Sequence, residues 1–151
     1  MIGRIFRKIC TLVFKFFNRR FKDAVLYSVP KVYFKNNLIL GKKISFNDNV
    51  FIHAAGGVSI GNYCTLSHGV SILSTENDTS RWIARLKNED IHINKPICIG
   101  NNVWLCTNVT ICAGVTIADN IVVAAGAVVV SDLCESGCLY GGVPARKLKK
   151  I

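Results

Sequence analysis

The chain has 151 residues, half of them hydrophobic, which is enough for one domain with a buried core. No stretch approaches the 18 or more continuous apolar residues of a membrane-spanning helix, so composition argues against a helical integral membrane protein. The formal net charge of +10 suits anionic partners: a membrane surface, a nucleic acid or a phosphate-rich cofactor.

The first segment, residues 1–22, is basic and contains no acidic residue. It predicts an amphipathic helix, because apolar side chains recur at helical spacing over residues 2–21 with basic residues between them. Two interpretations stay open: a helix lying on an anionic membrane surface, or a helix that caps the rest of the fold or packs between subunits. The apolar positions are Ile2, Ile5, Phe6, Ile9, Leu12, Val13, Phe16 and Phe17.

No small-residue cleavage site follows this segment, so we do not expect a signal peptide. We expect a cytoplasmic protein, with the inner face of the membrane as its location if the helix binds lipid. In that reducing compartment the seven cysteines are expected to be free thiols, and their spacing does not predict a zinc site.

A period of six residues decides the expected fold. It predicts short strands joined by turns, three to each triangular coil, with the aliphatic residue of each unit pointing inward. Such coils stack into a single parallel β-helix over residues 23–150, with a short basic C-terminal tail. The in-phase residues are Ile93, Ile99, Leu105, Ile111, Ile117, Val123 and Val129, preceded by a second block of Leu40, Phe46, Ile52, Ile60, Leu66 and Ile72.

The two blocks are out of phase across residues 75–92, TENDTSRWIARLKNEDIH, which are polar and break the repeat. They predict a loop extruded from the β-helix, the kind of segment in which binding and catalytic residues concentrate.

Residues 38–150 resemble the hexapeptide-repeat acetyltransferases, most specifically through IGNNVW (99–104), AGVTIADN (113–120), VAAGAVVVSD (123–132) and GGVPARKLKK (141–150). The galactoside, maltose and polysaccharide O-acetyltransferases are the closest in pattern. The resemblance implies an all-β, left-handed parallel β-helix, a homotrimer, and acetyl-CoA in the groove between neighbouring subunits.

The resemblance also implies which residues line the site. The acetyl-CoA side falls on Trp104, Thr107, Ala125, Ser131 and Arg146. The acceptor side falls on Asn47, Asn77 and Asp78. No metal ligand is implied, and basic motifs interleaved with aromatic residues are missing from the repeat faces, so neither a metal nor a nucleic acid is expected.

The catalytic histidine of the family corresponds here to Asn77, which cannot act as a base. His92, at the exit of the loop, should lie near Asn77 and is the first candidate. His53, in a segment similar to that of serine acetyltransferases, is the second, and His68 is a third. A neutral imidazole suits the removal of a proton from an acceptor hydroxyl.

The function implied is transfer of an acetyl group from acetyl-CoA to a hydroxyl of a sugar or of a lipid-linked glycan precursor. Two alternatives remain: a serine-type O-acetyltransferase, although its large N-terminal helical domain has no counterpart here, and a CoA-binding or scaffold relative that has lost its base at Asn77.

Overall fold

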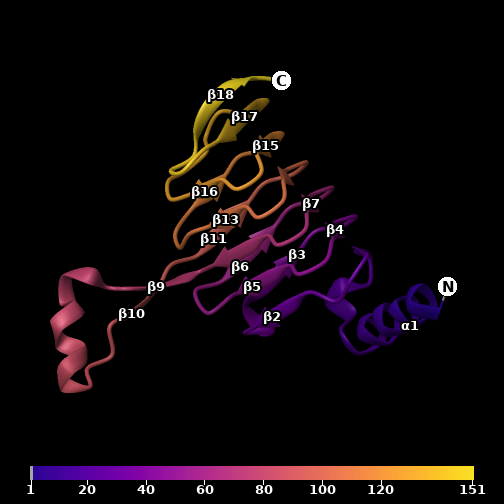
Figure 1. Ribbon diagram of the computed structural model, residues 1–151, viewed down its shortest axis with the longest axis horizontal. Helices are drawn as coiled ribbons and strands as arrows, with labels where there is room; N and C mark the ends of the chain where they lie inside the picture. The colour runs from indigo at the N-terminus through magenta and orange to yellow at the C-terminus, as the bar shows by residue number, and fades with distance from the viewer. Residues whose placement is uncertain (1) are drawn as a thin grey trace.

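The computed structural model describes residues 2–151, and the side chains of all of these except residues 2–4 and 7. The chain forms a three-sided prism of stacked coils, with a helix at one end and a two-stranded arm projecting from its middle (Figure 1). The predicted parallel β-helix is confirmed, and it is left-handed.

Each face of the prism is a parallel sheet formed by one strand from each coil. Face A contains β1 (Val25–Leu26), β4 (Ser45–Phe46), β7 (Thr65–Leu66), β12 (Trp104–Leu105), β15 (Ile121–Val123) and β17 (Cys138–Gly141). Face B contains β2 (Lys31–Tyr33), β5 (Phe51–His53), β8 (Ser71–Leu73), β13 (Thr110–Ile111) and β16 (Val128–Val129). Face C contains β3 (Leu38–Leu40), β6 (Val58–Ile60), β11 (Ile97–Ile99) and β14 (Thr116–Ile117), and the 3-10 helix η2 (Lys35–Asn37) precedes β3.

The core consists of aliphatic ladders that run along the prism axis. On face B, Ile52 pairs in register with Ile72, which lies next to Ile111. All three side chains are fully buried. Because strand neighbours point to opposite faces of a sheet, the residues flanking each buried one point outward. On face B, each coil thus places one large aliphatic side chain in the core.

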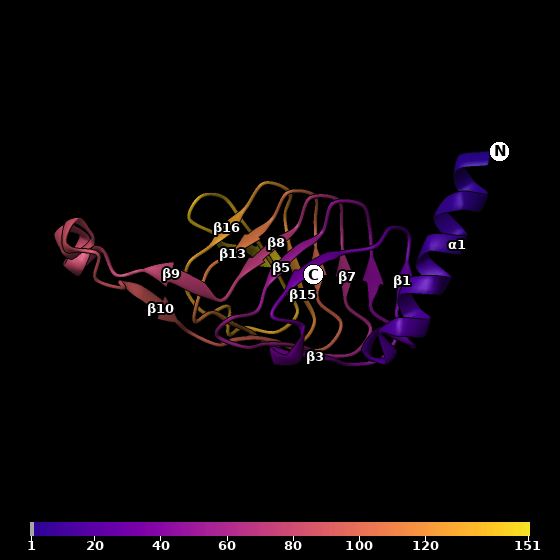
Figure 2. The ribbon, with the colours of Figure 1, turned by 90° about the horizontal axis from the view of Figure 1, so that it is seen from below.

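The arm leaves the prism after β8 and returns before β11 (Figure 2). It is an antiparallel hairpin of β9 (Thr75–Asn77) and β10 (His92–Asn94), topped by the 3-10 helix η3 (Thr79–Lys87). The predicted extruded loop is therefore confirmed. The ladder resumes beyond it without a change of register, since Ile97 pairs with Val58. Ile93 was expected to begin the downstream ladder. That expectation is wrong, because Ile93 lies on the arm, paired with Glu76.

The N-terminal helix α1 (Ile2–Phe17) is confirmed, but it ends four residues before the predicted boundary. A separate 3-10 helix, η1 (Arg19–Phe21), follows and places Phe21 in the core. Within the described residues, no helix has the length and apolar character needed to cross a bilayer.

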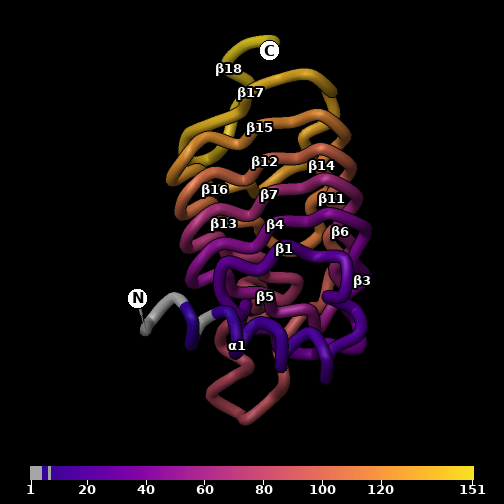
Figure 3. The backbone as a smooth tube through the Cα atoms, turned by 90° about the vertical axis from the view of Figure 1, so that its right-hand side faces the viewer, coloured from indigo at the N-terminus to yellow at the C-terminus, as the bar shows by residue number. Residues whose placement is uncertain are grey.

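The last strand reverses the direction of the sheet. β18 (Arg146–Lys150) pairs antiparallel with β17 and covers the final coil (Figure 3). The prism thus has α1 and η1 at its first coil and an antiparallel strand at its last.

Candidate active site

The predicted site residues fall on two edges of face B. One is the edge where each coil turns from face A to face B, here called the A–B edge. The other, where coils turn from face B to face C, is the B–C edge, and the arm leaves the prism there.

Most of the predicted acetyl-CoA residues line the A–B edge. Thr107 lies one coil below Ala125, because its carbonyl accepts a hydrogen bond from the Gly126 N–H at 2.8 Å. His68 lies one coil lower again, since its carbonyl accepts from the Asn108 N–H at 2.9 Å. His68, Thr107 and Ala125 therefore form a column along the prism axis. A groove for an elongated ligand needs such a column.

Two further residues lie beside this column, at the end of face A. The indole of Trp104 is half exposed, and its Nε1–H donates to Ser67 Oγ at 3.0 Å, which fixes the ring against the turn. Asn47 donates from Nδ2 to the Leu66 carbonyl at 3.2 Å, leaving its side-chain oxygen available as an acceptor. This edge thus combines the aromatic surface of Trp104 with the amide group of Asn47.

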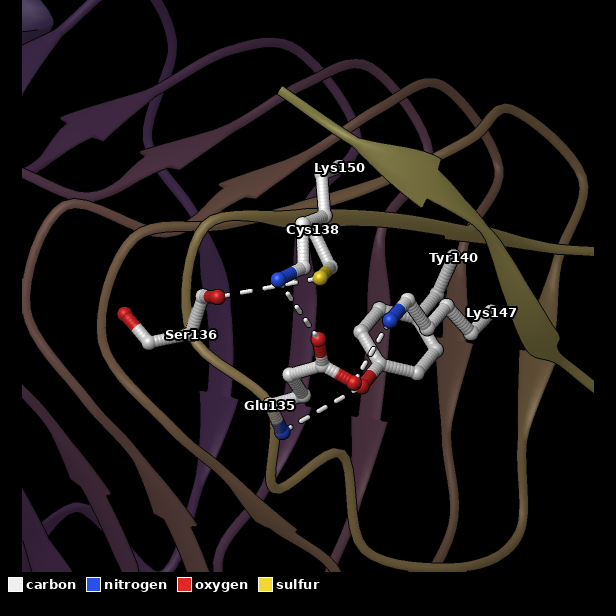
Figure 4. Close-up of polar contacts among 6 residues, drawn as sticks. All are labelled: Glu135, Ser136, Cys138, Tyr140, Lys147 and Lys150. Carbon is white, nitrogen blue, oxygen red and sulfur yellow. Dashed lines mark hydrogen bonds and ion pairs between the residues drawn. The ribbon is translucent and has the colours of Figure 1, made fainter.

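Arg146 lies at the C-terminal end of the same edge. The chain is fixed there by a hydrogen bond from the Ala145 N–H to the Val128 carbonyl at 2.8 Å. Glu135 stabilises the β17–β18 hairpin by pairing with Lys147 at 2.6 Å and by donating its backbone N–H to the Tyr140 hydroxyl at 3.3 Å (Figure 4). The exposed guanidinium of Arg146 is therefore carried by a well-anchored strand.

Ser131 is separated from these residues. It follows β16 on the B–C edge, just before Asp132 accepts a hydrogen bond from the Thr116 N–H at 2.7 Å and Leu133 forms a bridge with Ile117. Face B lies between Ser131 and the column of Thr107 and Ala125. A single chain thus does not bring all five predicted cofactor residues together.

The arm places His92 directly opposite Asn77, as antiparallel partners in register. The Nδ1 atom of His92 lies 2.7 Å from Asp90 Oδ1, and the same oxygen accepts the His92 backbone N–H at 2.9 Å. Both contacts lower the pKa of the Asp90 carboxyl, and the hydrogen bond from the His92 backbone N–H is the larger cause. An ionised Asp90 favours the His92 tautomer with the proton on Nδ1, which leaves Nε2 as a proton acceptor.

Asp90 was missed in the sequence. The available signal was the spacing of two residues between an aspartate and a histidine, which a local turn can close. Asp78, predicted to bind the acceptor, caps η3. Its Oδ1 accepts the Ser80 hydroxyl at 2.6 Å and the Ser80 N–H at 3.0 Å, and these bonds, with that hydroxyl contributing most, lower the pKa of Asp78.

His53 lies on face B near the root of the arm, in register with Leu73. Its ring meets the edges of Tyr33 and Phe34, at centroid distances of 6.0 and 5.1 Å. The Nδ1 atom is buried, and no group in the described part of the chain forms a hydrogen bond with it. His53 thus belongs to an aromatic cluster, whereas the His92 ring is exposed and has a carboxylate partner.

Nucleophilic thiolate and metal chemistry have little support at this site. Burial raises the pKa of the Cys64, Cys106 and Cys112 thiols, which disfavours their thiolate forms. Over the described residues, the structure holds no group of three His, Cys, Asp or Glu side chains that could bind a metal ion.

The fold and the two-edge site define a left-handed β-helix of hexapeptide repeats with an extruded arm. No family model matches the chain. Among solved structures, a hexapeptide-repeat acetyltransferase from Vibrio cholerae complexed with acetyl coenzyme A is similar, with a TM-score of 0.75 and 29% sequence identity over 84% of this chain and 67% of that one. The resemblance to the hexapeptide-repeat acetyltransferase superfamily is therefore confirmed.

Two other structures extend the likeness. A maltose O-acetyltransferase from Clostridium difficile has a TM-score of 0.71 and 29% identity, covering 85% of this chain and 66% of its own. A galactoside acetyltransferase in complex with coenzyme A has a TM-score of 0.68 and 27% identity, covering 84% and 64%. The chain spans about two thirds of the length of these relatives.

Proposed function

We propose that the protein transfers an acetyl group from acetyl-CoA to a hydroxyl of a sugar or glycan precursor. The observation that carries this proposal is the likeness, over 84% of the chain, to an acetyltransferase complexed with acetyl-CoA. The acceptor class follows the maltose and galactoside enzymes, which have the same fold.

The active site is formed between two copies of the chain in a homotrimer. The arm and Ser131 lie on one edge of face B, and Trp104, Thr107, Ala125 and Arg146 lie on the other. If face B points toward a threefold axis, the B–C edge of each subunit meets the A–B edge of the next. The outward side chains of face B suit this packing, because only Lys31 among them is charged; the others are Phe51, Ser71, Thr110, Val128, Tyr33, His53, Leu73, Cys112 and Val130.

Acetyl-CoA lies along the A–B edge. The small Ala125 lets the thin pantetheine arm approach the backbone, and Trp104 offers a half-exposed apolar surface beside it. Arg146 meets phosphate with the forked hydrogen bonds of a guanidinium group. The cofactor thus needs only residues that the structure keeps solvent-accessible.

His92 acts as the general base. Its Nε2 takes the proton from the acceptor hydroxyl as that oxygen attacks the thioester carbonyl. The C–S bond breaks, and the proton passes to the departing CoA sulfur, giving the acetyl ester and free CoA. Asn77, across the hairpin, and Asn47, on the neighbouring subunit's A–B edge, hold the acceptor through their amides.

The acceptor's location is a further part of the proposal. The basic segment 1–22 favours a protein at the inner face of an anionic membrane, where a lipid-linked glycan precursor would be accessible. A water-soluble sugar with the same hydroxyl would react by the same chemistry.

The test is to incubate the protein with acetyl-CoA and a panel of sugars, serine and other hydroxyl compounds, and to measure release of free CoA. Sugar-dependent release is expected. Release with serine alone would favour a serine-type enzyme. Binding of CoA without release by any acceptor, with turnover gained in the Asn77→His variant, would identify a non-catalytic relative.

A further inference from the structure

The helix α1 is attached to the prism by one narrow side. Thr11 is buried there, and the ring of Phe14 packs edge-on against Phe21 with 5.1 Å between centroids. Phe21 lies 5.5 Å from Phe46 in the core. At the end of the helix, Asn18 donates from Nδ2 to the Phe14 carbonyl at 2.8 Å. The attachment therefore does not use the apolar face of the helix.

That apolar face remains exposed along its whole described length. Phe16 and Phe17 are 80% and 77% exposed, and Leu12 is 67% exposed. The helix extends outward from face A, away from the arm (Figure 2). A run of large exposed apolar side chains marks an interaction surface. Its described members are Ile5, Phe6, Ile9, Leu12, Val13, Phe16 and Phe17, each at least half exposed.

A positively charged hollow adjoins this face at the end of the helix. Its volume is about 590 Å³, and no carboxylate lines it. None of the ion pairs within the described residues involves its cations. The lining residues are Phe17, Asn18, Arg19, Arg20, Phe21, Lys35 and Asn36.

We infer that this hollow binds the phosphate of an anionic lipid while the apolar face of α1 enters the acyl chains just beneath the headgroups of the same leaflet. Arg19 and Arg20 supply guanidinium groups suited to phosphate oxygens, and Lys35 adds a third cation. Phe17 belongs to both the hollow and the apolar face, so one ligand can contact both. A phospholipid does so with its headgroup and its chains.

Two other occupants fit less well. A free phosphate ion would use the cations and leave the apolar face in water. A second copy of the chain would cover the apolar face but bring two positively charged hollows close together, which like-charge repulsion opposes. An interfacial helix combined with a basic cluster supplies the two signals that stable membrane attachment requires.

The experiment is co-sedimentation of the full chain with phosphatidylglycerol vesicles and with phosphatidylcholine vesicles at low and high salt. Binding to the anionic vesicles, weakened by salt, is expected. The double variant Arg19→Gln, Arg20→Gln should bind about 30-fold more weakly, given the attraction of each cation to an anionic leaflet. The variant Leu12→Ser, Phe16→Ser should also lose binding, and millimolar inorganic phosphate should not displace the protein.

Matched controls make the same loss of charge or of hydrophobicity elsewhere on the molecule. The double variant Lys87→Gln, Lys149→Gln removes two exposed cations elsewhere, and Ile83→Ser, Ile151→Ser removes two exposed apolar side chains elsewhere. Both controls should bind vesicles like the parent.

Three results would overturn the inference. They are unchanged vesicle binding in the arginine variant, full displacement by inorganic phosphate, and a smaller oligomer in the Leu12→Ser, Phe16→Ser variant, which would show that α1 covers a second copy. Vesicle binding requires no turnover, and turnover on a water-soluble sugar requires no vesicle. Failure of this inference is therefore distinguishable from failure of the proposed acetyl transfer.

Discussion

At the scale of single residues, the pair His92 and Asp90 carries the proposed chemistry. His92→Ala should lower turnover by about 100-fold or more, the usual scale for loss of a general base. The affinity for acetyl-CoA should hold, since Trp104, Thr107, Ala125 and Arg146 lie on the other edge. Steady-state rates and a CoA-binding titration measure the two effects. His53→Ala is the comparison: if it alone abolishes activity, the base has been misassigned.

Asp90→Asn tests orientation of the imidazole. The amide keeps the size of the side chain but removes the carboxylate that favours the Nδ1–H tautomer. Turnover should fall while KM for acetyl-CoA stays, because the imidazole loses the partner that holds its Nε2 atom ready to accept a proton. A variant whose lower turnover is accompanied by a lower melting temperature would indicate a merely structural role for Asp90.

Gly56 is a second residue with a specific requirement. A Cβ added there would meet the Ser74 carbonyl oxygen and, at 2.7 Å, the Lys95 nitrogen, which are backbone atoms at the two roots of the arm. Gly56→Ala should therefore destabilise the protein by about 1–3 kcal/mol, as overpacking does, and displace the arm. The melting temperature and the turnover should both fall. An unchanged melting temperature would show that the roots of the arm can shift freely.

At the scale of elements, the β17–β18 hairpin gives a pH-dependent contribution to stability. The hydrogen bond from Lys147 is the largest cause of the lowered pKa of Glu135. A carboxyl whose pKa is lower in the folded than in the unfolded state stabilises the fold at pH values above its unfolded-state pKa, which is near 4.5 for Glu135. That contribution is lost as the pH falls through the folded-state pKa. Glu135→Gln should therefore lower the melting temperature slightly at neutral pH, and the difference should close below pH 4.5. A difference that persists in acid would contradict the ion-pair explanation.

The sequence predicted the elements unevenly. The six-residue period specified the coils, because every buried position needs an aliphatic side chain. It misplaced Ile93, since an apolar residue on the arm matched the phase by chance. The hairpin register that sets His92 against Asn77 depends on backbone pairing, which leaves no periodic trace in so short a strand. Asp90 was missed because its role depends on a local turn, and the division of the site between two edges appears only when the coils are closed.

At the scale of the whole molecule, the proposed site requires two subunits. Sedimentation equilibrium should give a trimer at micromolar concentration. Trp104→Ala and His92→Ala should each be nearly inactive alone. Mixed trimers of the two should recover about one quarter of the parent activity, because random assembly joins an intact arm to an intact A–B edge at that fraction of interfaces. Mixed trimers with no recovery would place both residues in one subunit's site.

The antiparallel strand β18 has a consequence for how these prisms behave in a crowded solution. A stack of parallel strands ends in a row of unpaired backbone groups, onto which another stack could add and begin a fibre. Here the row on β17 is already paired, and β18 is exposed throughout and carries Arg146, Lys147, Lys149 and Lys150. The first coil of another molecule, stacking onto this end, would meet these cations instead of unpaired backbone groups of β17. The strand that holds Arg146 beside the cofactor groove thus also protects the protein against linear polymerisation.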